Sequence, residues 1–460
     1  MGKRDHPREQ WGKYGRRPVV LLACVAFIDA VDRGILPGIL TKVQDEFGFS
    51  DFEAGALSTA AVLAGLLAVL PAGYLADRYH RTRIIAVVLA SWGAISALNA
   101  AVRNYSQFLA VRAVLGFGET IDNPASGSLI ADYYPVTRRG RAYAMQRVAP
   151  FVGAAVGTGV GGGIAAVWGW RWAFLVVGVP GSLLAIAVWR LPEPTRGEHD
   201  VLVEPDDIVL SASLPEREAA VSALPVSPER PRSDRQGVRA LMREIRMCLA
   251  IPTIRSLLVG SAMASGALSG IGFWAPAFLE RHAGLGSGTS AGLVGGLIFF
   301  GALLGTVLGG RFTDRFSGRV AGAPMLLAGV TQALGAAFLL PVFADVPLGV
   351  RMALSVVGVM FIVAGFPALA VMMTEVVPSQ IRGLAFSVSS VLSSATGALS
   401  PLIIGAISDQ FDYTFDGKTV GNLAYAFAIV MPLVFVGAFV VLRGRRYVAA
   451  DIARAQRSSL

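Results

Sequence analysis

Long apolar segments, separated by short polar stretches, dominate this chain. Twelve of them can be delimited, each of about the 20 residues that a helix needs to cross a bilayer. They cover residues 18–40, 54–76, 84–102, 107–130, 142–166, 171–190, 254–279, 288–310, 320–343, 351–374, 383–408 and 420–442. The pattern predicts an all-α membrane protein with twelve transmembrane helices.

One long polar stretch divides these helices into two sets of six. Residues 191–253 are too polar to insert into a bilayer and too rich in proline to fold alone. We therefore expect a basic N-terminus at 1–17, a six-helix bundle at 18–190, a cytoplasmic linker at 191–253, a second bundle at 254–443 and a tail at 444–460. Between Val238 and Leu249, apolar residues and arginines alternate at helical spacing. This suits either an amphipathic helix on the inner leaflet or a short helix in a solvated linker.

Basic residues gather in every second loop. They are Lys3, Arg4, Arg8, Lys13, Arg16, Arg17, Arg78, Arg81, Arg83, Arg138, Arg139, Arg141, Arg311, Arg315, Arg319, Arg443, Arg445 and Arg446. The alternate loops carry mainly acidic residues, so the positive-inside rule places both termini in the cytoplasm of a multi-pass protein of the inner (plasma) membrane. This bias explains the net charge of +9 and favours contact with anionic lipids, without nucleic acid.

Two short motifs recur in both halves of the chain. Gly-Tyr-Leu-Ala-Asp-Arg at 73–78 returns as Gly-Arg-Phe-Thr-Asp-Arg at 310–315, and Pro-Val-Thr-Arg-Arg-Gly at 135–140 returns as Pro-Ser-Gln-Ile-Arg-Gly at 378–383. Similar motifs at corresponding positions are typical of a transporter built from two related helical bundles.

Charged residues well inside the predicted spans occur in the first half. The second half has six stretches without any charged residue, at 256–279, 287–310, 320–344, 352–374, 383–408 and 419–442. Asp29, Asp32 and Arg33 lie in the first span, Arg112, Glu119 and Asp122 in the fourth, and Arg147 in the fifth. A charge at the centre of a span costs roughly 2.5–3.5 kcal/mol on the insertion scale, so such residues mark a candidate functional site.

Helical spacing suggests how these charges are arranged. Asp29 and Arg33 are four residues apart and can pair, and Asp32 is expected on a similar side. Arg112 is placed to pair with Asp29 or Asp32, which leaves Glu119 near the middle of the membrane. Burial opposes ionisation of a carboxylate and a nearby arginine favours it, so such a group can change charge near neutral pH. This fits either proton coupling or a static ion-pair network that aligns the helices.

Small residues and proline suggest close packing. Gly34, Pro37 and Gly38 follow the first charged group, where they predict a kink that serves either as a gate or as ordinary packing. The glycine-rich run at 153–163 lacks the sequence of a phosphate loop and indicates tight helix crossing.

Aromatic and methionine residues are frequent in the second half. If some of them face a central cavity, that cavity has one apolar and one charged wall and suits an amphiphile. Its head would lie near spans one and four, and its tail near spans seven, eight and ten. We expect Asp29, Arg33, Arg112 and Glu119 to contact the substrate.

The motif at 73–83 resembles the signature loop of the major facilitator superfamily. The resemblance implies a fold of two pseudo-symmetric six-helix bundles. It also implies a cytoplasmic latch, which we assign to Gly73, Asp77, Arg78, Arg81, Asp314 and Arg315.

A narrower resemblance is to the Spinster family of lysolipid and sphingolipid transporters. Asp32-Arg33 and the segment from Arg112 to Glu119 are similar to that family's elements in spans one and four. The resemblance implies that Asp32 and Glu119 couple transport to protons and that Arg33 contacts the head group. Asp29 departs from the asparagine usual there, which bears on the substrate.

These patterns favour a monomeric, proton-coupled carrier of a lysophospholipid or a sphingosine-like amphiphile. The alternatives are a proton-driven multidrug antiporter and a transporter-like sensor without turnover. We expect no enzyme activity, no cofactor and no metal, because the histidines fall in loops or tails and no ligand spacing exists. Cys24 and Cys248 are not expected to form a disulfide.

Overall fold

The computed structural model describes residues 11, 13–195, 237–316, 322–377 and 382–457. The first half contains α1 (Arg17–Phe47), α2 (Asp51–Arg78), α3 (Arg81–Leu98), η2 (Asn99–Ala101), α4 (Tyr105–Tyr133), α5 (Val136–Trp168) and α6 (Trp170–Trp189). The second contains α9 (Gly237–Ala250), α10 (Pro252–Ala283), α11 (Ser287–Phe316), α12 (Ala323–Leu339), η3 (Leu340–Phe343), α13 (Leu348–Val376), α14 (Arg382–Ser408), β1 (Asp412–Phe415), β2 (Lys418–Gly421), α15 (Leu423–Val430) and α16 (Pro432–Arg457).

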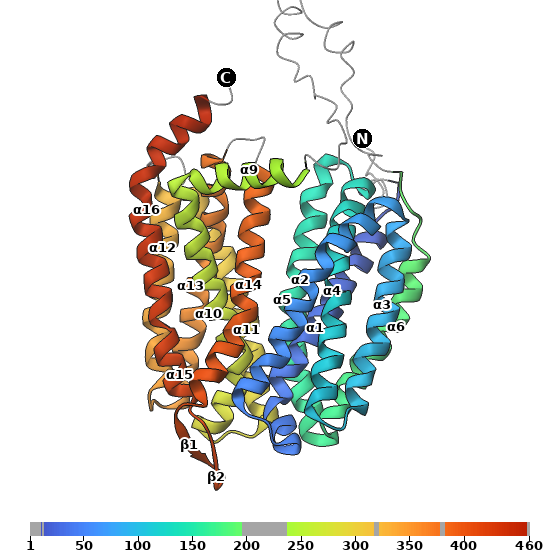
Figure 1. Cartoon of the computed structure of the whole chain (residues 1–460), viewed down its shortest axis with the longest axis vertical. Coiled ribbons are helices and arrows are strands. Elements are labelled where there is room, and N and C mark those ends of the chain that lie inside the picture. Colours follow the sequence, from blue (N-terminus) through green and yellow to red (C-terminus); the bar gives the residue numbers. More distant parts are fainter. Residues whose placement is uncertain (1–10, 12, 196–236, 317–321, 378–381, 458–460) are drawn as a thin grey trace, which may run out of the picture.

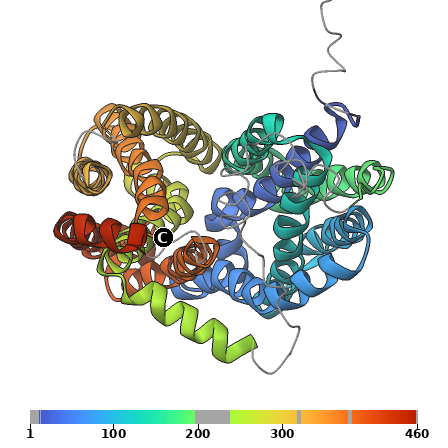
Figure 2. The ribbon, with the colours of Figure 1, turned by 90° about the horizontal axis from the view of Figure 1, so that it is seen from above.

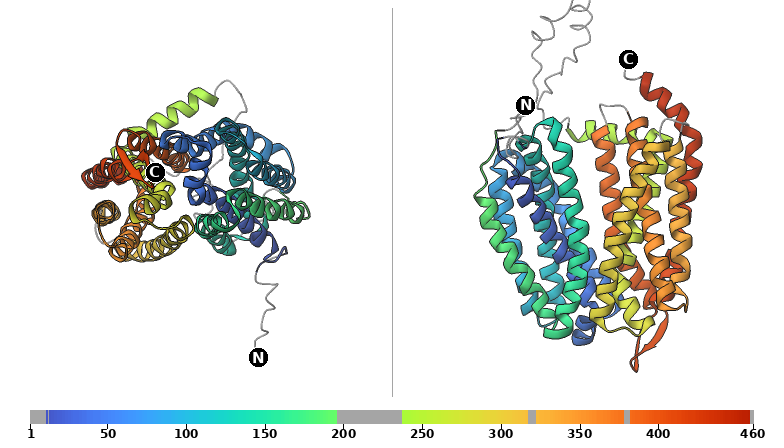
Figure 3. Two further views of the ribbon diagram at one scale, coloured as in Figure 1. Left: turned by 90° about the horizontal axis from the view of Figure 1, so that it is seen from below. Right: turned by 180° about the vertical axis from the view of Figure 1, so that it is seen from behind.

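The long helices stand side by side in two groups (Figures 1 and 2). α1 begins and α16 ends at the same end of the molecule, which we call the terminal end; the opposite end is the distal end. The antiparallel hairpin β1–β2 projects from the distal end (Figure 3). The predicted all-helical membrane fold is confirmed, although the sequence pattern gave no sign of the hairpin.

Ten helices of the described residues are long and apolar enough to cross a membrane. α1 and α4 are not among the ten, although they have 31 and 29 residues and pack within the first bundle. Both carry charged residues near their middle. Several helices, such as α1, α10 and α11, extend beyond the predicted spans, and α16 continues to Arg457, where a tail from residue 444 was expected. α9 occupies the stretch expected to be amphipathic and lies across the terminal end of the second bundle (Figure 1).

Glycines bring α1 and α5 into backbone contact. A Cβ atom added at Gly153 would lie 2.3 Å from the carbonyl oxygen of Phe27, and one at Gly157 would lie 2.1 Å from that of Val31. Gly34 of α1 meets the carbonyl oxygen of Ala154 in the same way. The predicted tight crossing at the glycine-rich run is therefore confirmed, and Gly34 serves packing.

We expect Gly157→Ala to lower the stability of the protein by about 1–3 kcal/mol, because the new methyl group has no room beside Val31. Gly163→Ala is the matched control on the same helix, since nothing lies within 4 Å of the added atom. Thermal unfolding in detergent measures both, and equal melting temperatures would contradict the close approach.

Buried apolar side chains form one cluster that joins the bundles and two that belong to single bundles. The shared cluster lies in the distal half and combines Ile39 and Leu57 with Phe273 and Phe427. Towards the terminal end, one cluster is confined to the first bundle and another to the second. The bundles are therefore packed against each other at the distal end.

Candidate functional site

Three helices of the first bundle bring polar side chains together around Asp32. The side chain of Asp32 is fully buried, and its Oδ1 accepts a 2.5 Å hydrogen bond from the hydroxyl of Ser96 on α3. Its Oδ2 lies 3.4 Å from Nη1 of Arg112 on α4, which is also buried. The structure thus pairs Arg112 with Asp32. A buried pair of this kind is stable only if its remaining polar atoms are also hydrogen-bonded, and Ser96 supplies one such bond.

Asp29 and Arg33 form a second ion pair, within α1. The Arg33 side chain is 48% exposed, in contrast to Asp32, which precedes it by one residue. Successive residues of a helix are separated by about 100°, so Arg33 leaves the bundle interior where Asp32 enters it. Asp32 points towards α3 and α4, and Asp29, three residues earlier, lies about 60° from it around the helix axis.

Glu119 is the middle residue of α4, two helical turns from Arg112 towards the terminal end. Its side chain, like that of Asp122, lies outside the residues whose side chains the structure describes. Gly116, between Arg112 and Glu119, presses against α2, since an added Cβ would lie 1.8 Å from the carbonyl oxygen of Ala61. That glycine therefore sets the helix spacing beside the site.

An apolar cavity of about 230 Å³ lies mainly within the second bundle. Its wall is formed by α10–α13, η3 and α15, with residues such as Leu268, Phe278, Val294 and Phe343. Phe151 of α5 completes it from the first bundle. Of the aromatic residues expected at an apolar wall, Phe278 lines this cavity, whereas Phe273 and Trp274 are buried in the core and Phe300 is exposed.

The packing of α1 on α5 relates this cavity to the polar residues. Gly153 lies opposite Phe27 and Gly157 opposite Val31, so the two helices are aligned along this contact. By this alignment, Phe151 lies about one helical turn, or ~6 Å along the axis, from the level of Asp29 towards the terminal end. Asp29 and the first-bundle wall of the cavity therefore lie within about one helical turn of each other in depth.

Of the residues assigned to the latch, Arg81 is buried and bonded within its own bundle. Its guanidinium contacts Asp132 and Ser128 of α4 and Glu193, which follows α6. Asp314 and Arg315 are exposed in the last turn of α11. The side chains of Asp77 and Arg78, and the surroundings of Gly73, lie outside those described, so the latch as a whole stays a prediction.

Glu193 gives this region a pH dependence. Burial raises the pKa of Glu193, but hydrogen bonds from Thr82 and Arg81 outweigh it, so the pKa lies below the ordinary value of 4.5. A lowered carboxyl pKa stabilises the fold above the pKa of the unfolded chain, and this stability is lost as the pH falls through the folded-state pKa.

We therefore expect Glu193→Gln to lower the melting temperature near neutral pH, and this difference from the unmodified protein to shrink below about pH 4. Thermal unfolding in detergent across this range measures it. A difference that stays constant with pH would contradict the assigned role of the carboxylate.

Sequence reasoning missed several residues of the polar clusters, among them Ser96 and Arg281. Ser96 gave no signal, since a serine within an apolar span is common and its partner Asp32 is 64 residues away. Arg281 lies just beyond the charge-free stretch of its span, at the distal end of α10, where it bonds Asp51 of the first bundle. A scan for charges at the ends of spans would have noticed it, but not its partner. Among the described residues, no cluster of His, Cys, Asp or Glu suits a metal ion.

The fold and its charged first bundle agree with comparisons to known proteins. A family model described as Major Facilitator Superfamily matches residues 22–366 and, in a second match, 283–458. The chain belongs to the Major Facilitator Superfamily. It is therefore a multi-pass membrane transporter, in a superfamily whose members are typically not enzymes.

The individual transporters that are similar in sequence match only part of this chain. It is 32% identical over 194 residues to the probable L-galactonate transporter of Escherichia coli (strain K12), which is 42% of each protein. It is 30% identical over 194 residues to protein spinster of Drosophila melanogaster, which is 42% of this chain and 31% of that protein. The alignments thus span less than half the length of these curated relatives.

A solved structure of another protein matches this chain over almost its whole length. It is the crystal structure of a bacterial homolog of the human lysosomal transporter Spinster, in an inward-facing and unoccupied conformation. The TM-score is 0.77 at 21% identity, and the match covers 96% of this chain and 99% of that one. The predicted resemblance to Spinster proteins is confirmed; at this identity the structural likeness is one of fold.

Proposed function

We propose that this transporter moves an amphiphilic lipid, such as a lysophospholipid or a sphingosine-like amphiphile, by proton-coupled alternating access. We place it in the inner (plasma) membrane with twelve spans, α1 and α4 included, and with both termini in the cytoplasm. With this orientation the packed distal end faces outwards, and the state described is inward-facing.

The observation that carries the proposal is the contrast between the walls of the two bundles. The second bundle offers an apolar cavity, and the first offers Asp29, paired with the half-exposed Arg33, at a similar depth. Ligand sites are often mainly apolar with a few polar groups that fix orientation. An amphiphile fits this division, because its acyl chain fills the cavity while its head group meets the charged pair.

Asp32 is proposed as a protonation site together with Glu119. In the described state, Asp32 holds α1 against α3 and α4 through Ser96 and Arg112. Protonation removes the attraction between Asp32 and Arg112, so the packing of these three helices depends on the charge of one carboxyl. A conformational equilibrium can be biased only by such a difference in interactions between two states.

A second candidate substrate is a small carboxylate. Relatives bear the names L-galactonate, galactarate/D-glucarate and 4-hydroxybenzoate transporter, and all of these compounds are carboxylates. The half-exposed Arg33 guanidinium suits a carboxylate. This candidate leaves the apolar cavity without a role, so we rank it second.

The purified protein in vesicles tests the proposal. We expect a lysophospholipid to be transported and to move protons, whereas L-galactonate at the same concentration does neither. Transport of L-galactonate without transport of the lipid would show that the substrate is a small carboxylate rather than an amphiphilic lipid. Proton flux only with cationic drugs would indicate a multidrug antiporter, and lipid binding without flux would indicate a sensor.

A further inference from the structure

A buried ion pair joins the two bundles at the distal end. Nη1 of Arg281, near the end of α10, lies 2.7 Å from Oδ2 of Asp51, and its Nη2 lies 2.8 Å from Oδ1. Asp51 is the first residue of α2, so the pair links the start of a first-bundle helix to the end of a second-bundle helix. A two-pronged contact of this kind is geometrically specific as well as strong.

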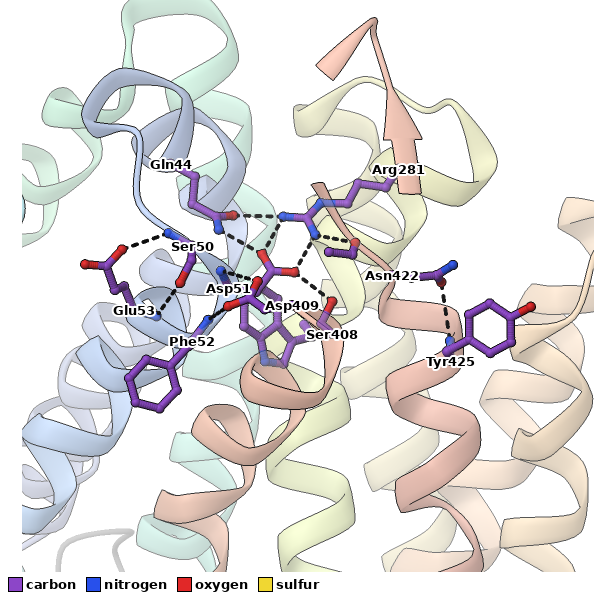
Figure 4. Close-up of polar contacts among 12 residues, drawn as sticks. Gln44, Ser50, Asp51, Phe52, Glu53, Arg281, Ser408, Asp409, Asn422 and Tyr425 are labelled. Atoms are coloured by element: carbon purple, nitrogen blue, oxygen red, sulfur yellow. Dashed lines mark hydrogen bonds and ion pairs between the residues drawn. The ribbon is translucent and has the colours of Figure 1, made fainter. Parts of the chain in front are cut away.

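Neighbouring side chains complete the bonding of this pair (Figure 4). Gln44 of α1 accepts from Arg281 at 3.1 Å and donates to Asp51 at 2.9 Å. The hydroxyl of Ser408, at the end of α14, donates to Asp51 at 2.8 Å. Oδ1 of Asp51 thus has one partner from each bundle, and Oδ2 has two partners from the second bundle. Such bonds are what a buried carboxylate needs to remain charged.

Asp409 adds a second attachment beside the first (Figure 4). Its carboxylate accepts from the backbone N–H groups of Asp51 at 3.1 Å and Phe52 at 2.8 Å. These donors belong to the first turn of α2, where N–H groups have no partner within the helix and a negative charge is favourable. A residue of the second bundle therefore caps a helix of the first.

The local backbone is shaped for this contact. Gly48, with φ of 68°, ends α1 in the left-handed conformation, and Ser50 and Glu53 bond each other's backbone at the start of α2. An added Cβ at Gly405 of α14 would lie 2.2 Å from the carbonyl oxygen of Asp51. Only glycine there allows α14 to approach closely enough for Ser408 and Asp409 to reach α2.

Burial separates this cluster from an ordinary surface ion pair. The side chains of Arg281 and Asp51 are 4% and 2% exposed, whereas those of Lys418 and Asp45, which also link the bundles, are 64% and 65% exposed. Exposed pairs contribute little to stability, but separating a buried pair leaves two charges that must find water or new partners. A cavity of about 690 Å³ between the cluster and the hairpin can admit that water.

We propose that Gln44, Asp51, Arg281, Ser408 and Asp409 form a lock that holds the distal end closed, and that this end opens only when Asp51 parts from Arg281. The lock is a two-state element: in one arrangement the bonds exist, and in the other the distal faces of the bundles are apart. The proposal rests on alternating access between the bundles and is independent of which substrate is carried.

Distance measurement between spin labels tests the lock without any substrate. Cysteines replace Arg103 and Asp345, which are exposed at the distal ends of the first and second bundles, after Cys24→Ala and Cys248→Ala. The protein is placed in lipid nanodiscs. We expect one short distance in the parent protein. In Asp51→Asn we expect at least about a tenfold rise in the ratio of long to short distances, because the charge that holds Arg281 is gone.

Two further variants make the result decisive. Lys418→Ala removes the exposed ion pair and should leave the distances unchanged. An increase in the ratio of long to short distances equal to that of Asp51→Asn would mean general loosening and would overturn the lock.

Ser408→Ala removes one bond to the carboxylate of Asp51 and should give a smaller increase in this ratio. It replaces Asp51→Asn if that variant does not fold. Unchanged distances in a folded Asp51→Asn or, failing that, in Ser408→Ala would also overturn the lock. If the spin-label distances agree with the lock but lysophospholipid is not transported, only the proposed substrate is wrong.

Discussion

Asp32→Asn abolishes pH-driven transport while the protein remains folded: this is the largest functional effect that we expect. Asparagine has nearly the same size; its Oδ1 can accept from Arg112 and its Nδ2 can donate to the hydroxyl of Ser96, so we expect the protein to fold. It cannot take up a proton. If one proton is coupled to each substrate molecule, a difference of one pH unit across the membrane supports about a tenfold ratio of substrate concentrations. In the variant, the substrate concentrations on the two sides should become equal.

Uptake of substrate into vesicles with an imposed pH difference measures this effect. Asp45→Asn is the matched control, because that carboxylate is exposed at the distal end and pairs only with the exposed Lys418 among its described ion pairs. We expect Glu119→Gln to resemble Asp32→Asn. If both variants accumulate substrate like the parent protein, the assignment of the protonation sites is wrong.

Arg112→Gln should have the largest effect on stability. It removes the guanidinium that faces Asp32 and leaves a fully buried carboxylate with Ser96 as its remaining described hydrogen-bond partner. Breaking a buried pair by removing one partner typically costs about 3–5 kcal/mol. We expect a large fall in melting temperature and in the yield of folded protein.

The double variant Asp32→Asn with Arg112→Gln separates the charge from the packing. Because it removes both charges and keeps similar side-chain volumes, most of the lost stability should return, and the two substitutions should be strongly non-additive. Transport should stay absent in the double variant. Additive losses in thermal unfolding would show that Arg112 stabilises the protein by packing rather than by pairing with Asp32.

The two ion pairs of α1 illustrate how far spacing along a helix could predict the site. The separation of four residues identified Asp29 and Arg33 as partners, and they do pair. Asp32 is three residues from Asp29, and spacing alone placed it on a similar side. Spacing could not identify the partners of Asp32, because these depend on where α3 with Ser96 and α4 with Arg112 pack.

Glycines were easier to interpret than polar residues. The run at 153–163 predicted a close crossing, because small residues at short intervals leave one face of a helix flat. The partner helix was not predictable, since α5 contacts α1 through some of these glycines and α11 through others, such as Gly162 against Ala291. The partner depends on how the bundles assemble.

By itself, the sequence determined the helical membrane fold, the two related halves and the concentration of charges near the middle of the spans in the first of them. These properties follow from local composition and from the high cost of placing charge in lipid, which act wherever the chain folds. Only the tertiary structure decided that Ser96 and Arg112 enclose Asp32, that an apolar cavity lies within about one helical turn of the depth of Asp29, and that Arg281 meets Asp51. These contacts join residues 64 to 230 positions apart, and such pairings depend on how helices pack rather than on the pattern within any one of them.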